Sequence, residues 1–530
     1  MKDIPAQRYL YALSTLAIFA ITHLPVAAQE TDVVNAPNTV GAGNKRSLSD
    51  QIGAGQGSVM LPNSSIFIIQ RDPFRSIARG RSLFQRKFTH AEGNGPRTGD
   101  GMGNLDVDAS IAAGLTDSCA ACHGRPKGSA GVGGNVFTRP DSRDAPHLFG
   151  LGLVEMLGDE ITADLRRIRE RSILMATNRG RSIRMPLVSK GIRFGSIIGR
   201  PDGTADTRRV QGVDEDLRVR PFFAEGSTIS IREFVVGAFN AEMGLESNDS
   251  LLRAAAAGQD VITPSGMKLP GSVDAIEAPP AASDWDDPDG DGVVNEIPTS
   301  LVDHMEFYLL NYFKPGLGRQ TRTTRQGREL LARIGCTQCH VPDLVIDNDR
   351  RVADVETGYD PNQPGFNHLF ATATPLFSQS SDGTGFATRK TPLGGGFIVR
   401  NFYADLKRHD LGPAFHERNF DGTMQKEFVT EPLWGVGTTA PYGHDGRSID
   451  LHEVILRHGG EAMRSRGRYA RLGRWEQNAI LSFLNSLILF PPIDTASNLD
   501  PADPTAPGFP QFGHGSIKLS VLFNNPLIIQ

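Results

Sequence analysis

The sequence predicts a mainly α fold, built from two similar helical domains that carry long loop elaborations. Apolar residues recur at helical spacing in two stretches, 327–334 and 472–487, as they do on the buried face of a helix. Strand signals are sparse outside the connecting loops and the tail. The four cysteines of the chain form two copies of one short motif, at 119–123 and 336–340, and the first helical stretch leads directly into the second copy.

Length and composition narrow the class of protein. A chain of 530 residues with 39% apolar residues favours two or three domains with ordinary cores. The formal charge of -5, without a long basic run, gives no reason to expect a nucleic-acid partner. The 58 glycines and 34 prolines indicate a loop-rich globular protein.

The N-terminus has the pattern of a signal peptide over residues 1–28. Lys2 and Arg8 precede an apolar stretch at 9–22 that is short for a membrane span, and small residues offer cleavage after Ala28. An uncleaved anchor is the alternative. No other segment approaches the length of a membrane span, so we expect an exported, periplasmic protein without an integral membrane segment after cleavage.

The repeated motif is Cys-x-x-Cys-His. Two cysteines three residues apart lie on the same side of one helical turn, where they can form thioethers with one haem, and the histidine then ligates the iron. A redox dithiol or half of a zinc site would explain the cysteines but not a histidine after both pairs. The sequence therefore predicts two covalently attached haem c groups, bound through Cys119, Cys122 and His123 and through Cys336, Cys339 and His340.

These two motifs organise the predicted domains. Residues 1–28 are the signal peptide, 65–280 an N-terminal cytochrome c-like haem domain with inserted loops, 281–315 an acidic connector, 316–492 a C-terminal cytochrome c domain and 493–530 a tail. The face of the terminal helix is predicted to consist of Leu472, Trp475, Ala479, Ile480, Phe483 and Leu487. A Gly-Arg-x-Leu start recurs at Gly80 and Gly327, which supports a duplication weakly.

The connector contains the first half of a calcium loop. Alternating aspartates before Gly292 can converge on a cation, because the glycine allows a sharp turn. The twelfth position is Pro298 in place of the bidentate glutamate of an EF-hand, so a solvated acidic turn is the equal alternative. The predicted calcium ligands are Asp287, Asp289, Asp291, the carbonyl of Val293 and the side chain of Asn295.

Several of these segments together resemble one family. The motifs are "SCAACHGRP", "HLFGLGLVEML", the acidic loop and "PYGHDGR", spread over about residues 65–492. They resemble the di-haem oxidoreductase family related to bacterial di-haem cytochrome c peroxidases and to the methylamine-utilisation di-haem enzyme. The resemblance implies an enzyme that reduces hydrogen peroxide, or another small oxidant, at the N-terminal haem. Electrons would come from an exported donor protein through the C-terminal haem, and relatives often form homodimers.

The resemblance also implies a sixth ligand for the C-terminal haem. Where the peroxidases have a methionine about fourteen residues beyond the His-Asp-Gly segment, this sequence has His458. A histidine at that position gives the haem a lower potential than a methionine would. The alternative is a surface or core histidine. His409 is the rival ligand, although a hydrogen-bonding role suits it better.

At the N-terminal haem, the resemblance assigns a distal carboxyl group to Glu155. A carboxyl group there can move a proton between the two oxygens of peroxide, so Glu155 is the predicted catalytic residue, and a salt bridge is its alternative role. His147 is either a second iron ligand or, as we favour, a polar residue in a turn; His90 is a weaker candidate. Met156 and Met185 are expected to pack in the core.

The sequence assigns no residue to electron transfer between the haems. The relatives use a tryptophan, but Trp285, Trp434 and Trp475 all lie outside the N-terminal haem domain. Trp434 fits a core role better than a relay. The Arg- and Gly-rich stretch 191–223 is predicted to be a loop beside the N-terminal site.

Two alternatives to a peroxidase stay open. With six-coordinate iron at both sites, the protein would be an electron-transfer cytochrome without peroxidase activity. It would instead be an oxidase or oxygenase if it acted on an organic or protein substrate. The length of the loops favours an enzyme, because a carrier does not need them.

Overall fold

The computed structural model describes residues 60–95, 116–123, 144–312, 314–362, 369–419 and 422–489. Helices take up 37% of the described residues and strands 17%, so the prediction of a mainly α fold was wrong. The physical reason lies in the long loops, which satisfy their backbone groups by pairing with themselves in short antiparallel ladders. The predicted signal peptide at 1–28 and the predicted tail at 493–530 lie outside the described residues.

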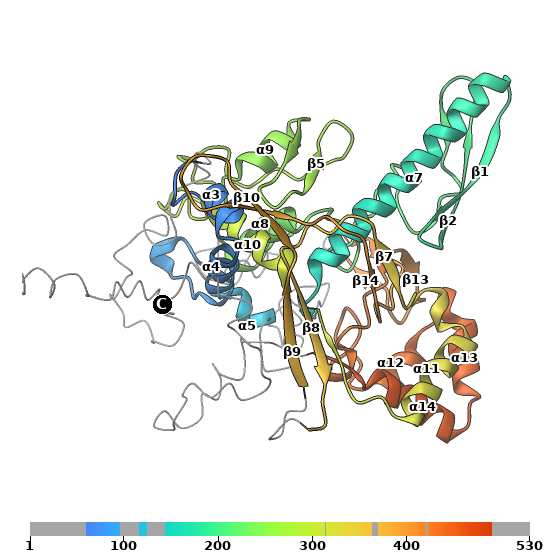
Figure 1. Cartoon of the computed structure of the whole chain (residues 1–530). Coiled ribbons are helices and arrows are strands. Elements are labelled where there is room, and N and C mark those ends of the chain that lie inside the picture. Colours follow the sequence, from blue (N-terminus) through green and yellow to red (C-terminus); the bar gives the residue numbers. More distant parts are fainter. Residues whose placement is uncertain are drawn as a thin grey trace, which may run out of the picture. The chain divides into compact units, whose positions relative to one another are not determined.

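The helices and strands follow one another along the whole described chain (Figure 1). The α-helices are α3 (Ser65–Arg71), α4 (Pro73–Gln85), α5 (Cys119–His123), α7 (Leu151–Arg179), α8 (Ile231–Met243), α9 (Ser250–Ala256), α10 (Thr299–Asn311), α11 (Arg322–Ile334), α12 (Leu451–Arg457), α13 (Met463–Ala470) and α14 (Arg474–Leu484). Short 3-10 turns are η2 (His90–Glu92), η3 (Cys336–Gln338), η4 (Val436–Thr438) and η5 (Gly460–Ala462).

The strands form one three-stranded sheet and several two-stranded ladders. They are β1 (Ile183–Ser189), β2 (Ile192–Gly199), β3 (Ala205–Asp206), β4 (Asp260–Ile262), β5 (Lys268–Pro270), β6 (Gly316–Leu317), β7 (Leu344–Ile346), β8 (Ala353–Tyr359), β9 (Leu369–Pro375), β10 (Phe377–Ser380), β11 (Arg389–Pro392), β12 (Phe397–Val399), β13 (Arg408–Asp410), β14 (Glu417–Arg418), β15 (Met424–Gln425), β16 (Glu427–Val429) and β17 (Leu487–Ile488).

The hairpin β1–β2 replaces part of the loop predicted at 191–223. The strands pair antiparallel, and the two residues between them, Lys190 and Gly191, have φ of 47° and 83°. Positive φ at both positions is typical of the tight hairpin turn that matches strand twist. The hairpin lies along α7 (Figure 1), where Leu187, Phe194 and Ile197 are buried.

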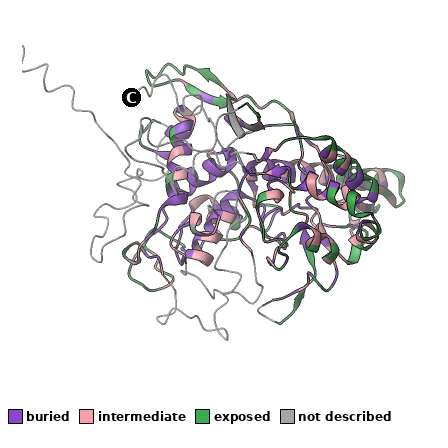
Figure 2. Ribbon diagram, turned by 90° about the horizontal axis from the view of Figure 1, so that it is seen from below, coloured by how far each residue is buried: buried purple, intermediate pink, exposed green. Residues whose placement is uncertain are grey.

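The N-terminal core is built on the crossing of α4 and α10. A Cβ atom on Gly80 would lie 2.2 Å from the carbonyl oxygen of His304, so only glycine lets the two backbones approach this closely. Buried residues, purple in Figure 2, are gathered on the helical ribbons. Helix α10 falls inside the predicted connector, yet it packs in this core. The domain boundaries at 280 and 315 stay a prediction.

The C-terminal core repeats this arrangement with α11 and α14. A Cβ atom on Gly327 would lie 1.9 Å from the carbonyl oxygen of Ala479, so the second Gly-Arg-x-Leu segment also marks a close helix crossing. Leu330, Leu331 and Ile334 are buried as predicted. Trp475 is 57% exposed, which corrects its predicted place on the buried face of the terminal helix.

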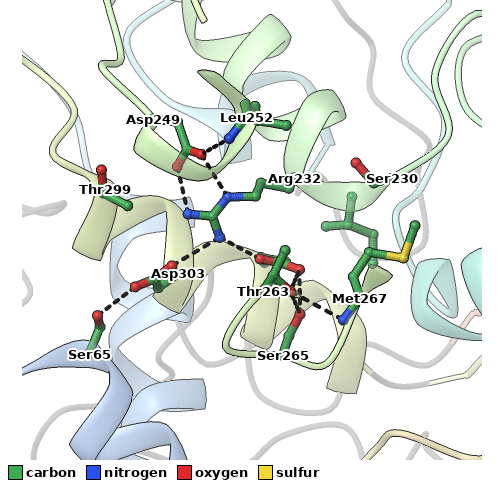
Figure 3. A network of polar contacts seen from close by, with 12 residues as sticks. Ser65, Ser230, Arg232, Asp249, Leu252, Thr263, Ser265, Met267, Thr299 and Asp303 are labelled. Carbon is green, nitrogen blue, oxygen red and sulfur yellow. Dashed lines mark hydrogen bonds and ion pairs between the residues drawn. The ribbon is translucent and has the colours of Figure 1, made fainter. Parts of the chain in front are cut away.

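A buried arginine ties α8, α9 and α10 together (Figure 3). Arg232 pairs with Asp249 at 2.6 Å, with Asp303 at 2.9 Å and with Glu306 at 2.7 Å. The side chains of Arg232, Asp249 and Asp303 are fully buried, so these contacts carry a heavy desolvation cost that only complete pairing offsets. None of the described helices is long and apolar enough to cross a membrane.

Candidate functional site

The first Cys-x-x-Cys-His motif forms the short helix α5. Cys119 and Cys122 are partly buried on one turn, and neither forms a disulfide with a described residue. The Nδ1 atom of His123 donates a hydrogen bond to the carbonyl oxygen of Pro146 at 2.6 Å. In a neutral ring this bond leaves the lone pair on Nε2, which is how proteins orient a metal-binding histidine. Burial lowers the pKa of His123, which favours that neutral ring.

The second motif has the same arrangement in a different local structure. Cys336 begins η3, and Cys339 and His340 follow it directly. The Nδ1 atom of His340 donates to the carbonyl oxygen of Tyr403 at 3.0 Å, and burial again lowers the pKa of this imidazole. Both histidines thus present a neutral Nε2 as a ligand atom, and the donor set of the two motifs fits two covalently bound haems.

His458 shares the features of these two histidines. It ends α12, where its Nδ1 atom bonds to the carbonyl oxygen of Val454 at 2.6 Å. Burial lowers the pKa of His458 to about 4, and the proximity of His340 disfavours the protonated form in the same direction. His458 is therefore a neutral histidine near His340 with Nε2 as its lone-pair nitrogen, as a sixth ligand requires.

His409, the rival ligand, is occupied at both ring nitrogens. Its Nε2 atom contacts Asp405 at 2.9 Å and its Nδ1 atom contacts Glu461 at 2.8 Å. Burial alone would lower the pKa of His409, but hydrogen bonds to Asp405 and Cys339 raise it to about 11. An imidazolium that donates a hydrogen bond from each ring nitrogen has no lone pair for a metal. The contacts of His409 are therefore those of the hydrogen-bonding role that its sequence context favoured.

His147 is also occupied at both nitrogens. Its Nε2 atom donates to the carbonyl oxygen of Trp434 at 2.7 Å, and its Nδ1 atom accepts from the backbone N–H of Phe149 at 3.2 Å. This geometry supports the polar turn role over iron ligation. The side chain of His90 lies outside the described residues.

The bond from His147 to Trp434 begins a link between the two motifs that the sequence did not reveal. Pro146, whose carbonyl accepts from His123, is the residue directly before His147. The chain of contacts therefore runs from the first haem-motif histidine through one peptide unit to the backbone at Trp434.

The link continues to the second motif through main-chain groups. The N–H of Leu433 donates to the carbonyl of Phe402 at 3.2 Å, and the next residue, Tyr403, accepts from His340. The ring of Trp434 packs edge-on against that of Phe402, with centroids 5.0 Å apart. Two short segments thus connect His123 and His340 without a break.

Trp434 is the tryptophan that this link singles out. It is only 5% exposed, whereas Trp285 is 85% and Trp475 57% exposed. A Cβ atom on Gly150 would lie 2.3 Å from its ring, so the tryptophan packs directly on the N-terminus of α7. Trp434 is thus a core residue, and its position between the two motifs also suits a relay.

Glu155 lies one turn into α7 and is 1% exposed. One carboxylate oxygen accepts from the N–H of Ile231 at 2.7 Å, and the other pairs with Arg350 at 2.6 Å. Burial raises the pKa of Glu155 to about 7, although Arg350 opposes the shift. The contacts are those of the salt-bridge alternative, whereas a pKa near neutrality suits proton transfer.

Two glutamates that the sequence analysis missed lie close to the aspartates of the acidic connector. Ligand oxygens within 4.8 Å of one another come from two sets that share Asp289: one includes Glu246 and Asp287, the other Asp291 and Glu296. Burial, with Asp289 and Asp291 nearby, raises the pKa of Glu296 to about 8. Glu296 lies ten positions into the loop, where an EF-hand search would not look, and Glu246 is distant in sequence.

Comparisons with known proteins point to one family. Residues 372–487 match the family model described as "Di-haem oxidoreductase, putative peroxidase". No curated protein matches the chain. Two similar solved structures are a hydrazine synthase of Kuenenia stuttgartiensis and a MauG-like protein associated with microbial copper homeostasis.

The two structural matches are distant. The first is 15% identical with a TM-score of 0.21, over 36% of this chain and 55% of that one. The second is 18% identical with a TM-score of 0.18, over 36% and 52%. The chain therefore spans about half the length of these structures, and scores this low carry no argument about its fold.

Proposed function

We propose that the chain is an exported di-haem c-type enzyme that reduces hydrogen peroxide to water, starting from the match of residues 372–487 to the di-haem oxidoreductase family model. The observation that carries the proposal is the pair of Cys-x-x-Cys-His histidines. Each is held neutral with Nδ1 on a backbone carbonyl, and contacts run from one to the other.

The residues divide into attachment and ligation. The cysteines at 119, 122, 336 and 339 would form thioethers with the two haems, and His123 and His340 would each ligate one iron. The haems, when bound, supply iron that accepts and gives single electrons. His458 would be the second protein ligand of the C-terminal iron, and peroxide would then bind at the N-terminal site.

Reduction of one peroxide to two waters consumes two electrons and two protons. An exported electron-donor protein supplies the electrons at the C-terminal site, and the contacts through Trp434 and His147 offer a route to the N-terminal one. Glu155 moves a proton between the peroxide oxygens, since its raised pKa lets it accept and release one near neutral pH.

The proposal also includes location, metal and assembly. The signal peptide at 1–28 directs the protein to the periplasm, where haem c is attached. A calcium ion binds the acidic loop at Asp287, Asp289 and Asp291, with Val293 and Asn295 as further oxygen donors. A homodimer is the proposed assembly, as in the relatives.

Electron paramagnetic resonance of the haem-loaded protein tests this proposal. We expect a high-spin signal in the fully ferric or the half-reduced state, and loss of that signal when peroxide is added. Low-spin signals alone in both states would mean that both irons are six-coordinate. The protein would then be an electron-transfer cytochrome, and the peroxidase proposal would be wrong.

Replacing His458 with methionine tests its place as a ligand. We expect the potential of one haem to rise by on the order of 0.1 V, because a thioether ligand favours the reduced iron. Spectroelectrochemistry of both haems measures the shift. His416→Gln is the control, since His416 pairs with Asp410 at 2.8 Å, and its potentials should match the wild type. Unchanged potentials in His458→Met would rule out ligation.

A further inference from the structure

Glu296 has a buried carboxyl group with one oxygen that no described residue hydrogen-bonds. It is 4% exposed. Its Oε2 atom accepts from the N–H of Glu246 at 2.5 Å, whereas Oε1 has no hydrogen-bond partner among the described residues. Asp287 and Asp291 lie in the adjoining loop, where their carboxylates accept hydrogen bonds from backbone N–H groups of that same loop. Within the described part of the chain, these carboxylates and Glu296 form no ion pair with a lysine or arginine. A buried charge left this way is costly unless a cation compensates it.

The neighbouring backbone holds both glutamates in place. The N–H of Ile297 donates to the carbonyl of Glu246 at 3.0 Å, and the hydroxyl of Ser247 donates to the carbonyl of Ile297 at 2.9 Å. Ser247 and Ile297 also form a parallel bridge. The two acidic side chains are thus fixed next to each other before any ligand arrives.

We propose that one calcium ion binds at Asp289 and that the buried glutamates Glu246 and Glu296 complete its ligand set. Calcium takes six to eight oxygen ligands, and carboxylates with flexible geometry suit it. The loop alone lacks the acidic ligand of an EF-hand because its twelfth residue is Pro298. Glu296 within the loop and Glu246 from outside it supply that missing charge.

The position of the site gives the ion a structural role. A Cβ atom on Gly93 would lie 1.8 Å from Oε1 of Glu296, so the segment before the first haem motif rests on this carboxylate. The next residue, Asn94, donates to the carbonyls of Thr116 at 3.0 Å and Met243 at 2.7 Å. The ion therefore fixes the connector to the segment that leads into Cys119.

This inference rests on the calcium of the proposed function but not on its reaction. Titration calorimetry of the haem-loaded protein with calcium chloride tests it. We expect one site that prefers calcium to magnesium, and an affinity at least about tenfold weaker in Glu296→Gln. Glu170→Gln, which removes one exposed charge from α7, is the matched control and should bind calcium as the wild type does.

A second readout separates a ligand from a residue that only supports the fold. Without calcium, Glu296→Gln should melt no lower than the wild type, since the amide fills the same space and keeps an oxygen that can accept from the N–H of Glu246. With calcium, only the wild type should gain stability. A variant that melts lower in both conditions, or still gains from calcium, would overturn the assignment.

Terbium provides a check on location. Trp285 is exposed two residues before Asp287 and should sensitise the luminescence of terbium bound in the loop. Calcium should displace that signal, and Trp285→Phe should lose it while it still binds calcium. Equal binding of magnesium, or no heat with calcium, would contradict the proposal. Calcium binding in a protein without peroxide turnover would leave this inference standing and refute only the proposed reaction.

Discussion

Arg232→Met should lower the free energy of unfolding by about 3–5 kcal/mol, because removing one partner of a buried ion pair leaves the others uncompensated. Here three carboxylates lose the one guanidinium that contacts them all, and Arg232 itself is fully buried. Urea unfolding of the haem-loaded protein at neutral pH measures the loss.

Arg193→Met is the control for this experiment. Arg193 is exposed on β2, so the same change of side chain there should alter stability by no more than about 0.5 kcal/mol. If both variants lose equally little, the network of Figure 3 does not hold α8, α9 and α10 together.

Arg232→Met should also change how the free energy of unfolding depends on pH. Burial raises the pKa of Asp303 from 3.8 to about 6, although Arg232 opposes the shift. A raised carboxyl pKa gives stability that is fully present below pH 3.8 and is lost as pH rises through 6. Without Arg232 the pKa rises further, so the loss in Arg232→Met should extend to higher pH.

Glu155→Gln should reduce peroxide turnover by about 10²–10⁴-fold, the usual contribution of a general acid or base. The amide oxygen can still accept from the N–H of Ile231, and Arg350 keeps Asp159 at 3.7 Å, so the fold should persist. Because the group must be ionised to accept a proton, wild-type turnover should fall as pH drops below about 7. Steady-state kinetics across pH measures both effects.

Asp159→Asn separates this role from that of a salt bridge. Asp159 pairs with Arg218 at 2.7 Å, and its charge helps to raise the pKa of Glu155. Its loss should therefore lower stability and move the fall in turnover to lower pH, while the maximal turnover stays near that of the wild type. Normal turnover in Glu155→Gln, together with a stability loss like that of Asp159→Asn, would leave Glu155 with a structural role only.

The sequence revealed the parts of the fold that local pattern determines. The helix before the second motif was predictable because Leu330, Leu331 and Ile334 recur at helical spacing and face one core. The short ladders were not, because strands such as β8 and β9 are stabilised by their partner and carry little signal alone. Trp475 was assigned to the wrong face because its spacing allowed burial, whereas 57% of its surface is exposed in the folded chain.

The candidate site also has residues that the sequence identifies and residues that only the structure identifies. The attachment motifs carry their chemistry in adjacent residues and are legible without a structure. His458 and His409 look alike in sequence, and only their contacts separate a neutral histidine from an imidazolium bonded on both sides. Glu246 gives no signal at all, since its relation to Asp287 and Asp289 exists only after folding.

The chain of contacts that leads from His123 to His340 has a consequence for the evolution of such a protein. Apart from the imidazole of His147, the bonds between the two segments join main-chain groups. Main-chain groups are the same in nearly every residue type, so their bonds depend on the backbone conformation and not on the identity of the residues. Substitution of most other side chains along the route would therefore leave it intact. Two proteins could share such a route while a comparison of their sequences shows little in common beyond the three histidines.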